Sequence, residues 1–342
     1  MRLLLFLLSI IYRIIIQFRN FLFDYQILKT EIYKTPVICI GNISIGGSGK
    51  TPHTIYIAKL LSPQYNVAIL SRGYKRKSSG FNYVEINSYV SYVGDEPLQL
   101  KRNNPNCIVA VSKNRKKGIE KILNDHPKIN IILLDDGFQH RKIKAGLNIL
   151  LTPFYNPFTK DKLLPLGTLR EPASESIRAD IIIISKSPSN LLPPDKMAVI
   201  EKLNLRTNQK GYVSSIIYHK YKCIKDDTVL KNEGDYNITL VSGIENITPL
   251  INYLEEKERK VKLIKFADHH NYTAKDVKKI LSLHNKDKST KKLILTTEKD
   301  ATKLRAFMSD FKEDKVYYIP IEVTINEEET FKQQILEYVR NN

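Results

Sequence analysis

Short apolar runs rich in β-branched residues recur along the chain and predict buried strands. Between consecutive runs the apolar positions have helical spacing, so predicted strands and helices alternate. This order predicts an α/β fold with a mostly parallel sheet and helices on both faces. The first six predicted strands are 37–40, 66–70, 107–111, 130–134, 147–151 and 179–185.

The pattern changes at about residue 205. Polar-aromatic positions and charged turns over 209–235 predict a β-type linker, and strands alternate with helices again from about residue 237. We therefore expect an N-terminal helix (1–25), a first α/β domain (26–208), the linker (209–235) and a smaller α/β domain (236–342) that closes over the active site.

The first 25 residues are strongly apolar, with arginines at positions 2, 13 and 19. A membrane-spanning helix needs about 20 consecutive apolar residues, but Arg13 interrupts the run after residues 3–12. No small-residue cleavage site of a signal peptide is evident. The pattern predicts a helix that lies in the membrane interface. The alternative is a helix packed on the protein's own core.

Composition adds a strong positive charge: the 342 residues carry 54 Lys and Arg against 36 Asp and Glu, a net charge of +18. Such a charge favours an anionic partner, which can be nucleic acid, acidic lipid or a phosphorylated substrate. The lysines are spread along the whole chain without a nucleic-acid-binding motif, so we expect no nucleic-acid partner. Three cysteines without C-x-x-C spacing argue against a disulfide framework or a zinc site and indicate a reducing cytosol.

A glycine-rich turn follows the predicted strand at 37–40 and precedes a helix. The segment 36–52, PVICIGNISIGGSGKTP, approaches the phosphate-binding pattern G-x-x-x-x-G-K-[ST], with Ser44 at the first glycine position. Backbone N–H groups and the helix N-terminus can surround phosphates, Lys50 can reach them, and the Thr51 hydroxyl can bind Mg²⁺. A chance glycine-rich turn is the alternative. The expected nucleotide-binding residues are Ser44, Ile45, Gly46, Gly47, Ser48, Gly49, Lys50 and Thr51, in a P-loop NTPase-type domain.

Acidic residues stand at two later positions. Asp135 and Asp136 follow the strand 130–134, where nucleotide enzymes hold Mg²⁺, so we expect a metal role for at least one of them. The alternative is an ordinary Asp-Gly turn with Gly137. Asp95 begins a predicted helix, and the residues alone favour an N-cap role there.

Other polar residues follow strands, at the edge where parallel sheets bind ligands. Arg72 comes after 66–70, and Arg170 and Glu171 lie in a long proline-bearing loop, 163–172. In the smaller domain, DHH and TEKD (268–270 and 297–300) each follow a strand. If both domains place these edges on one cleft, their side chains would meet across it.

Seven segments together resemble one family, the tetraacyldisaccharide 4′-kinases of lipid A biosynthesis. They occur in the family's order over most of 36–305, and the departure at Ser44 is typical of that family. The resemblance implies an ATP-dependent kinase that phosphorylates the 4′-hydroxyl of a tetraacylated glucosamine disaccharide 1-phosphate, a glycolipid. It also fits attachment to the anionic cytoplasmic face of the inner membrane. The segments are PVICIGNISIGGSGKTP, SRGY, VGDEP, DDGFQH, LLPLGTLREP, FADHHNY and TTEKDATKL.

Roles for individual residues are implied by the same resemblance. Asp95 would be the general base that takes the hydroxyl proton, helped by His269, in place of the N-cap role. Roles for His270 and Lys299 stay open. The implied catalytic set is Lys50, Asp95, Asp136, Arg170, Glu171 and His269; Arg72 would join the nucleotide site, and Thr51, Asp135 and Asp136 would hold Mg²⁺.

Two other functions are compatible with parts of the sequence. A switch-type P-loop NTPase acting on a protein or metal partner would carry a similar glycine-rich loop. The apolar N-terminus and the DHH segment of the smaller domain favour the lipid kinase instead. A membrane-associated nucleic-acid binder is motivated only by the net charge.

Overall fold

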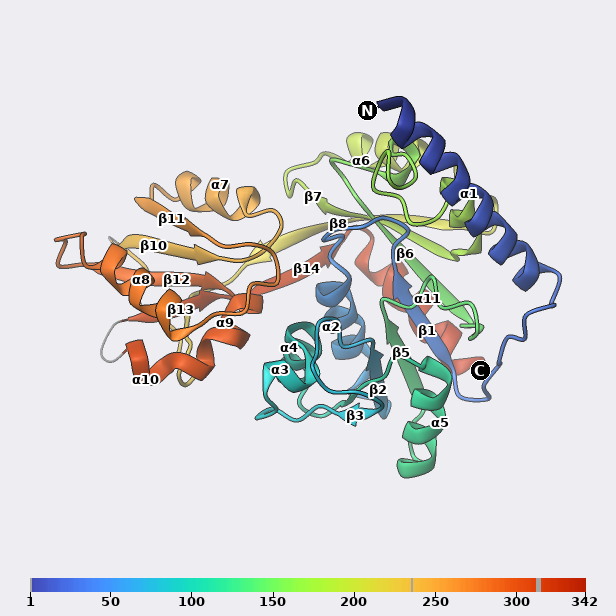
Figure 1. Ribbon diagram of the computed structural model, residues 1–342, viewed down its shortest axis with the longest axis horizontal. Coiled ribbons are helices and arrows are strands. Elements are labelled where there is room, and N and C mark those ends of the chain that lie inside the picture. The colour runs from blue at the N-terminus through green and yellow to red at the C-terminus, as the bar shows by residue number, and fades with distance from the viewer. Residues whose placement is uncertain (1, 235, 312–314) are drawn as a thin grey trace.

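The computed structural model describes residues 2–234, 236–311 and 315–342. Figure 1 shows two lobes, each built around a sheet, with helix α1 lying along the outside of the larger lobe. The larger lobe is called the nucleotide domain below, and the smaller one, β9 to β13 with α7 to α10, is called the C-terminal domain.

The nucleotide domain is built on a nine-stranded sheet in the order β14-β8-β7-β6-β1-β5-β2-β4-β3. Neighbouring strands run parallel except at the two edges, where β14 pairs with β8 and β3 pairs with β4 in antiparallel fashion. Its strands are β1 (Val37–Gly41), β2 (Val67–Ser71), β3 (Asn82–Tyr83), β4 (Ile108–Val111), β5 (Ile131–Asp135), β6 (Leu147–Pro153), β7 (Ile181–Ser187), β8 (Lys210–Tyr218) and β14 (Ile321–Ile325).

Helices cover both faces of this sheet, because alternate residues of a strand point to opposite sides. In β1, Ile38 and Ile40 belong to one core, whereas Val37 and Cys39 belong to the other. The expected α/β fold with helices on both faces is thereby confirmed. The first core lies under α2 (Lys50–Leu61), α4 (Asp95–Asn103) and α11 (Glu328–Arg340), and the second under α5 (Arg115–Asp125) and α6 (Pro193–Glu201).

The C-terminal domain has a five-stranded sheet in the order β11-β10-β12-β13-β9, parallel except for β9. One face packs against α7 and the other against α8, α9 and α10. Its elements are β9 (Lys222–Cys223), β10 (Asn237–Ser242), α7 (Thr248–Glu256), β11 (Val261–Lys265), α8 (Ala274–His284), β12 (Lys292–Thr297), α9 (Glu298–Leu304), α10 (Met308–Phe311) and β13 (Val316–Ile319). The short helices are α3 (Val90–Val93) and the 3₁₀ turns η1 (Phe158–Lys160), η2 (Ala173–Arg178) and η3 (Arg305–Phe307).

Two segments connect the domains. β8 of the larger sheet leads to β9 of the smaller one, and β13 returns through Pro320 to β14 of the larger one (Figure 1). The sequence boundary at 236–342 therefore differs from the structure, in which β14 and α11 join the nucleotide domain. They do so because Val323, Phe331 and Ile335 are buried in its core. The segment expected as a linker likewise contains β8, a strand of the larger sheet.

Helix α1 (Arg2–Asp24) is attached to the nucleotide domain by a few polar contacts. The Ser9 hydroxyl donates to the carbonyl of Leu163 at 3.1 Å, and the Tyr12 hydroxyl donates to the carbonyl of Arg170 at 2.9 Å. Most of its large apolar side chains stay exposed, so the helix does not pack into a core. Within the described residues it is the one helix long and apolar enough to cross a membrane by length and composition.

Candidate active site

The glycine-rich loop joins the buried strand β1 to the N-terminus of α2. Gly46 and Gly49 adopt positive φ values of 103° and 85°, a region that glycine enters without a steric penalty. Gly49 is the N-cap of α2 and makes no side-chain cap hydrogen bond. The first N–H groups of the helix are thus turned toward the loop, as in a phosphate-binding nest.

Neighbouring segments hold this loop in place. The N–H of Ile45 donates to the carbonyl of Thr168 at 2.7 Å, and the N–H of Arg170 donates to the carbonyl of Ile43 at 2.7 Å. The proline-bearing loop at 163–172 therefore supports the phosphate loop from one side. Lys50 Nζ donates to Asn42 Oδ1 at 3.2 Å. The sequence pattern alone does not indicate a role for Asn42, although this residue directly follows β1.

The two acids after β5 have different surroundings. Asp135 is buried, and its carboxylate accepts hydrogen bonds from the hydroxyls of Thr54 at 3.2 Å and Ser71 at 3.0 Å. Burial, with the nearby charges of Glu96 and Asp136, raises the pKa of Asp135 to about 7. Its oxygens thereby join β5 to α2 and β2.

Asp136 instead faces the phosphate loop. It adopts a positive φ of 54°, which turns its side chain out of the strand. Lys50 Nζ lies 3.7 Å from Oδ1, and a guanidinium nitrogen of Arg170 lies 3.6 Å from Oδ2. Lys50, Asp136 and Arg170 therefore form one charged cluster beside the loop.

A magnesium ion fits this oxygen set on chemical grounds. The buried Oδ1 of Asp136 accepts no hydrogen bond within the described residues. No group of three or more His, Cys, Asp and Glu that could hold a metal occurs in that part of the chain. Mg²⁺ commonly takes one or two carboxylates and completes its shell with phosphate oxygens and water, so such a group is not required. Asp136 and the Thr51 hydroxyl are suitable donors.

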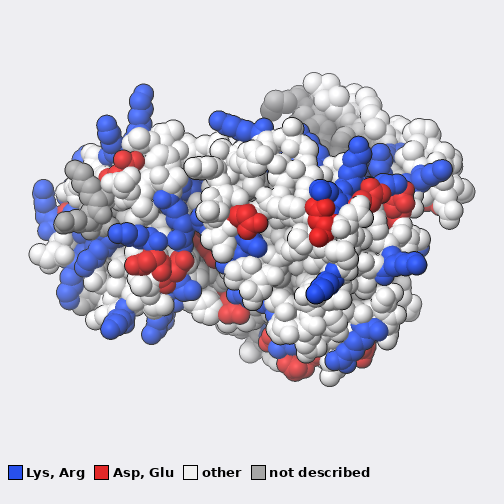
Figure 2. Space-filling view, turned by 90° about the horizontal axis from the view of Figure 1, so that it is seen from below, with Lys and Arg blue, Asp and Glu red and all other residues white. Residues whose placement is uncertain are grey.

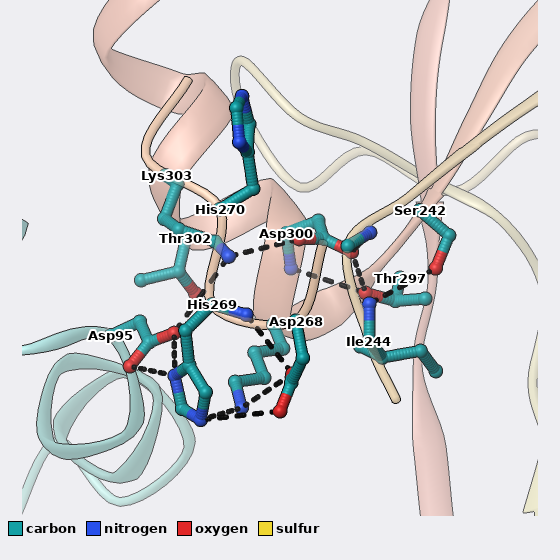
Figure 3. A network of polar contacts seen from close by, with 12 residues as sticks. Asp95, Ser242, Ile244, Asp268, His269, His270, Thr297, Asp300, Thr302 and Lys303 are labelled. Carbon is teal, nitrogen blue, oxygen red and sulfur yellow. Dashed lines mark hydrogen bonds and ion pairs between the residues drawn. The ribbon is translucent and has the colours of Figure 1, made fainter. Parts of the chain in front are cut away.

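Asp95 and His269 meet across the two domains (Figure 3). Asp95 begins α4, and its carboxylate oxygens lie 3.0 and 3.3 Å from Nδ1 of His269, in the loop after β11. Burial raises the pKa of Asp95, but the hydrogen bond from His269 and the charges of Lys299 and Lys303 outweigh it and hold that pKa well below its usual range. The carboxylate is therefore ionised at neutral pH.

Other residues of the C-terminal domain extend this network. Lys299 Nζ lies 3.1 Å from His269 Nε2 and 3.1 Å from Glu96 Oε1. The Tyr74 ring packs edge-on against the His269 ring at a centroid distance of 5.3 Å. By contrast, the His270 ring nitrogen Nε2 lies 3.1 Å from Asp276 at the start of α8, so His270 belongs to its own domain.

Lys186 is close enough to both the phosphate loop and the Asp95 network for charges of both to affect its pKa. Lys186, at the end of β7, has its pKa lowered by burial, and the charges of Glu245, Lys50, Lys299 and Asp268 also act on it. The C-terminal domain also reaches the phosphate loop directly, since the N–H of Gly47 donates to the carboxylate of Glu245. Both groups of residues therefore lie where the two domains contact each other. The strand-end pattern did not identify Lys186 or Glu245.

Two expected site residues have other surroundings. The Glu171 side chain is completely buried, and its two oxygens pair with Arg19 of α1 and with Arg178. These contacts tie α1 to the nucleotide domain. Arg72 is exposed directly after β2. Burial lowers the pKa of the Arg115 guanidinium, and the positive charge of Arg72 lowers it further, whereas the charge of Asp135 raises it.

Comparison with known proteins gives a consistent result over the whole chain. A family model described as tetraacyldisaccharide-1-P 4′-kinase matches residues 1–340. The tetraacyldisaccharide 4′-kinase of Bacteroides fragilis is 41% identical over 336 residues, which cover 95% of this chain and 89% of that protein. The protein of the same name from Flavobacterium johnsoniae is 40% identical over 348 residues, which cover 100% and 98%.

A solved structure supports the same relationship. The structure of the "apo" form of LpxK from Aquifex aeolicus in complex with ATP aligns with a TM-score of 0.78 and 31% sequence identity. The alignment covers 99% of each chain. The likeness therefore includes both domains and the N-terminal helix.

Proposed function

The chain belongs to the tetraacyldisaccharide-1-P 4′-kinase family, and we propose that it transfers the γ-phosphate of ATP to the 4′-hydroxyl of a tetraacyldisaccharide 1-phosphate, a lipid A precursor. The observation that carries this proposal is the Asp95–His269 contact between the two domains, which also meet at the phosphate loop through Gly47 and Glu245. A sugar hydroxyl is a weak nucleophile at neutral pH, so it gains from a carboxylate within hydrogen-bond reach.

The nucleotide domain would supply the phosphate site and the base, and the C-terminal domain would supply His269. The nest of 46–50 and the Lys50 ammonium would hold the ATP phosphates, while Asp95 would accept the proton of the 4′-hydroxyl. Lys50 and Arg170 would offset negative charge on the transferred phosphoryl group, which is the main requirement of this chemistry. Closure of the C-terminal domain would bring His269 against Asp95 and exclude water, which limits ATP hydrolysis.

Mg²⁺ is the proposed cofactor, held by Asp136 and Thr51. When bound, such an ion neutralises phosphate oxygens and orients them. Asp135, whose oxygens accept from Thr54 and Ser71, would set the position of Asp136 from the end of β5. Arg72 would lie at the outer side of the phosphate site. Glu171 would act indirectly, by anchoring α1 and the loop that carries Arg170.

We further propose that α1 attaches the protein to the cytoplasmic face of the inner membrane, where its lipid substrate resides. The exposed apolar side chains of α1 would enter the interface, and Arg2 and Arg13 would meet anionic headgroups. Figure 2 shows Lys and Arg side chains projecting from both lobes, with acidic side chains among them. That distribution favours a general attraction to an anionic surface over one dedicated patch.

The test is transfer of labelled phosphate by the full chain. ATP labelled at the γ-position and Mg²⁺ are supplied with the tetraacyldisaccharide 1-phosphate in mixed micelles. The control lipid is the same compound already phosphorylated at the 4′-position. We expect label on the first lipid alone. Hydrolysis of ATP at a rate independent of lipid, with no labelled glycolipid, would overturn the proposal.

A further inference from the structure

Two lysines of α9 contact the Asp95–His269 pair, and Figure 3 labels one of them, Lys303. Lys299 and Lys303 are four residues apart in the same helix, so they share one helical face. Lys299 Nζ lies 3.1 Å from Nε2 of His269, and Lys303 Nζ lies 3.7 Å from Oδ2 of Asp95. One lysine thus reaches each member of the pair.

Lys299 restricts the hydrogen position on His269. An ammonium group can only donate, so Nε2 has to accept, and the neutral ring then carries its hydrogen on Nδ1. That N–H donates to Asp95 at 3.0 Å. Burial lowers the pKa of Lys299, but Glu96, Asp95 and Asp268 outweigh it and raise that pKa above its usual value. The donor therefore stays charged while it contacts the ring.

Lys303 is buried beside Asp95. It is only 5% exposed, and its Nζ lies 3.0 Å from Oδ1 of Asp300, which is fully buried. Asp300 in turn accepts from the N–H of Gly243 and from the hydroxyl of Thr297, both at 2.8 Å. A buried ammonium with only one carboxylate of its own domain would be poorly compensated. The second carboxylate that it faces is Asp95, from the other domain.

The charges around Asp95 come from both domains. From the C-terminal domain, His269, Lys299 and Lys303 face the carboxylate, with Asp268 and Asp300 behind them. From its own helix, Glu96 lies beside Lys299. The charges of His269, Lys299 and Lys303 lower the pKa of Asp95 and so favour its ionised form.

We propose that Lys299 and Lys303 are positioning residues of the phosphoryl transfer: Lys299 selects the Nδ1–H form of His269, and Lys303 keeps the Asp95 carboxylate ionised. This inference rests on the proposed function, in which Asp95 is the base. According to this inference, α9 of the C-terminal domain places two positive charges beside the Asp95 carboxylate of the nucleotide domain when the two domains close.

The proposed role of Lys303 is tested by the pH dependence of single-turnover phosphate transfer to the glycolipid. Lys303→Met removes a cation, so the pKa of Asp95 rises, and the acidic limb of the rate profile moves up by about one pH unit. Above that limb the rate stays within about threefold of wild type, because the base itself is retained. Lys303→Arg keeps the charge and should restore the limb. Lys278→Met, an exposed change on α8, is the matched control.

The proposed role of Lys299 is tested by ¹⁵N NMR of the His269 ring in the full chain. We expect hydrogen on Nδ1 in wild type and a mixture of both ring forms in Lys299→Met. The same variant loses charge near Asp95, so its acidic limb also moves up. In addition, the transfer rate of Lys299→Met above the acidic limb falls about tenfold relative to wild type, whereas Lys303→Met shows no such fall.

The outcomes separate this inference from the proposed function. If wild type does not phosphorylate the lipid, the proposed function fails. If wild type is active but a folded Lys303→Met keeps the wild-type acidic limb, or Lys299→Met keeps the Nδ1–H form, the inference alone fails. A measurement on wild type covers the case in which the Lys303 variant does not fold. If ¹³C NMR of the wild-type protein shows the Asp95 carboxyl titrating with the ordinary pKa of about 4, the inference is overturned.

Discussion

The backbone N–H of Gly47 donates to the carboxylate of Glu245, so a side chain of the C-terminal domain lies against the phosphate loop. The carboxylate oxygens also fill the space beside Gly46, 2.8 and 2.9 Å from the point where a Cβ would stand. A nest of N–H groups binds carboxylates and phosphates by the same contacts. Glu245 therefore competes for the place that a nucleotide phosphate would take.

Replacing Glu245 by Gln should tighten ATP binding. The substitution removes a negative charge from the phosphate site while keeping side-chain size. We expect the dissociation constant for ATP, measured by calorimetry, to fall about three- to tenfold. Glu256→Gln, an exposed change on α7, is the matched control. Unchanged or weaker binding in Glu245→Gln would show that the contact does not compete with nucleotide.

Lys50→Met should impair both ATP binding and transfer. Its ammonium contacts Asn42 and faces Asp136 in the structure, so it is already oriented beside the loop. We expect a loss of at least about 100-fold in kcat/KM for ATP. Lys59→Met, on the exposed side of the same helix, controls for general effects on α2. Retention of wild-type ATP affinity by Lys50→Met would remove Lys50 from the nucleotide site.

Asp95→Asn should separate chemistry from nucleotide binding. The amide keeps the shape of the side chain but cannot accept the hydroxyl proton. We expect kcat to fall by about 10² to 10⁴, with the ATP dissociation constant within about twofold of wild type. Glycolipid phosphorylation measures the first quantity and calorimetry the second. A turnover near that of wild type would exclude Asp95 as the base.

Charges on the exposed face of α1 should release the protein from vesicles. Ile14 and Phe18 are 61% and 62% exposed, and each would lose about 1.5–3 kcal/mol of burial in the interface if replaced by Glu. We expect co-sedimentation of Ile14→Glu/Phe18→Glu with anionic vesicles to fall at least about tenfold. Ile32→Glu, 73% exposed outside the helix, is the control. Equal sedimentation of both variants would argue against attachment through α1.

His53 should make the nucleotide domain sensitive to acid. Burial lowers the pKa of His53 from 6.5 to about 4, so the unfolded chain binds its proton more readily. The stability it contributes is therefore complete above pH 6.5 and is lost as the pH falls toward 4. Linkage gives a loss of about 2 kcal/mol in the free energy of unfolding at pH 5.

Urea unfolding at pH 7.5 and pH 5 compares wild type with His53→Gln. The variant should lack that loss, although His140 contributes in the same pH range because burial and Arg115 also lower its pKa to about 4. An equal decrease in both proteins would show that His53 takes up its proton in the folded state.

Local patterns were sufficient for six strands of the larger sheet, β1, β2 and β4 to β7, but not for β3, β8 and β14 or for the partners of polar residues. The strands of the nucleotide domain are short apolar runs, and such runs are recognisable because burial on both faces demands them. Asp95 shows the limit. Its own neighbourhood favours an N-cap role, but the N-cap of α4 is Gly94, and the Asp95 carboxylate accepts instead from the N–H of the next residue, Glu96, at 3.0 Å. Its contact with His269 spans 174 positions, which no local pattern encodes.

Glu171 and β14 show the same limit in other ways. The family resemblance implied a catalytic role for Glu171 in the proline-bearing loop, yet its partners Arg19 and Arg178 come from two other elements. The alternating pattern of Ile321–Ile325 suits an edge strand of either sheet. The pairing of β14 with β8 places it in the larger sheet. This pairing depends on the direction that the chain takes at Pro320, between β13 and β14.

The return of β14 and α11 to the larger sheet has a consequence for biosynthesis. The ribosome makes residues 321–340 only after the whole C-terminal domain. Until then the β8 edge has no antiparallel partner, and the core positions filled by Phe331 and Ile335 lack their side chains. An unpaired edge next to exposed apolar surface is prone to aggregation. Nascent chains truncated before residue 321 should therefore depend on chaperones, although they already contain the phosphate loop, Asp95 and His269.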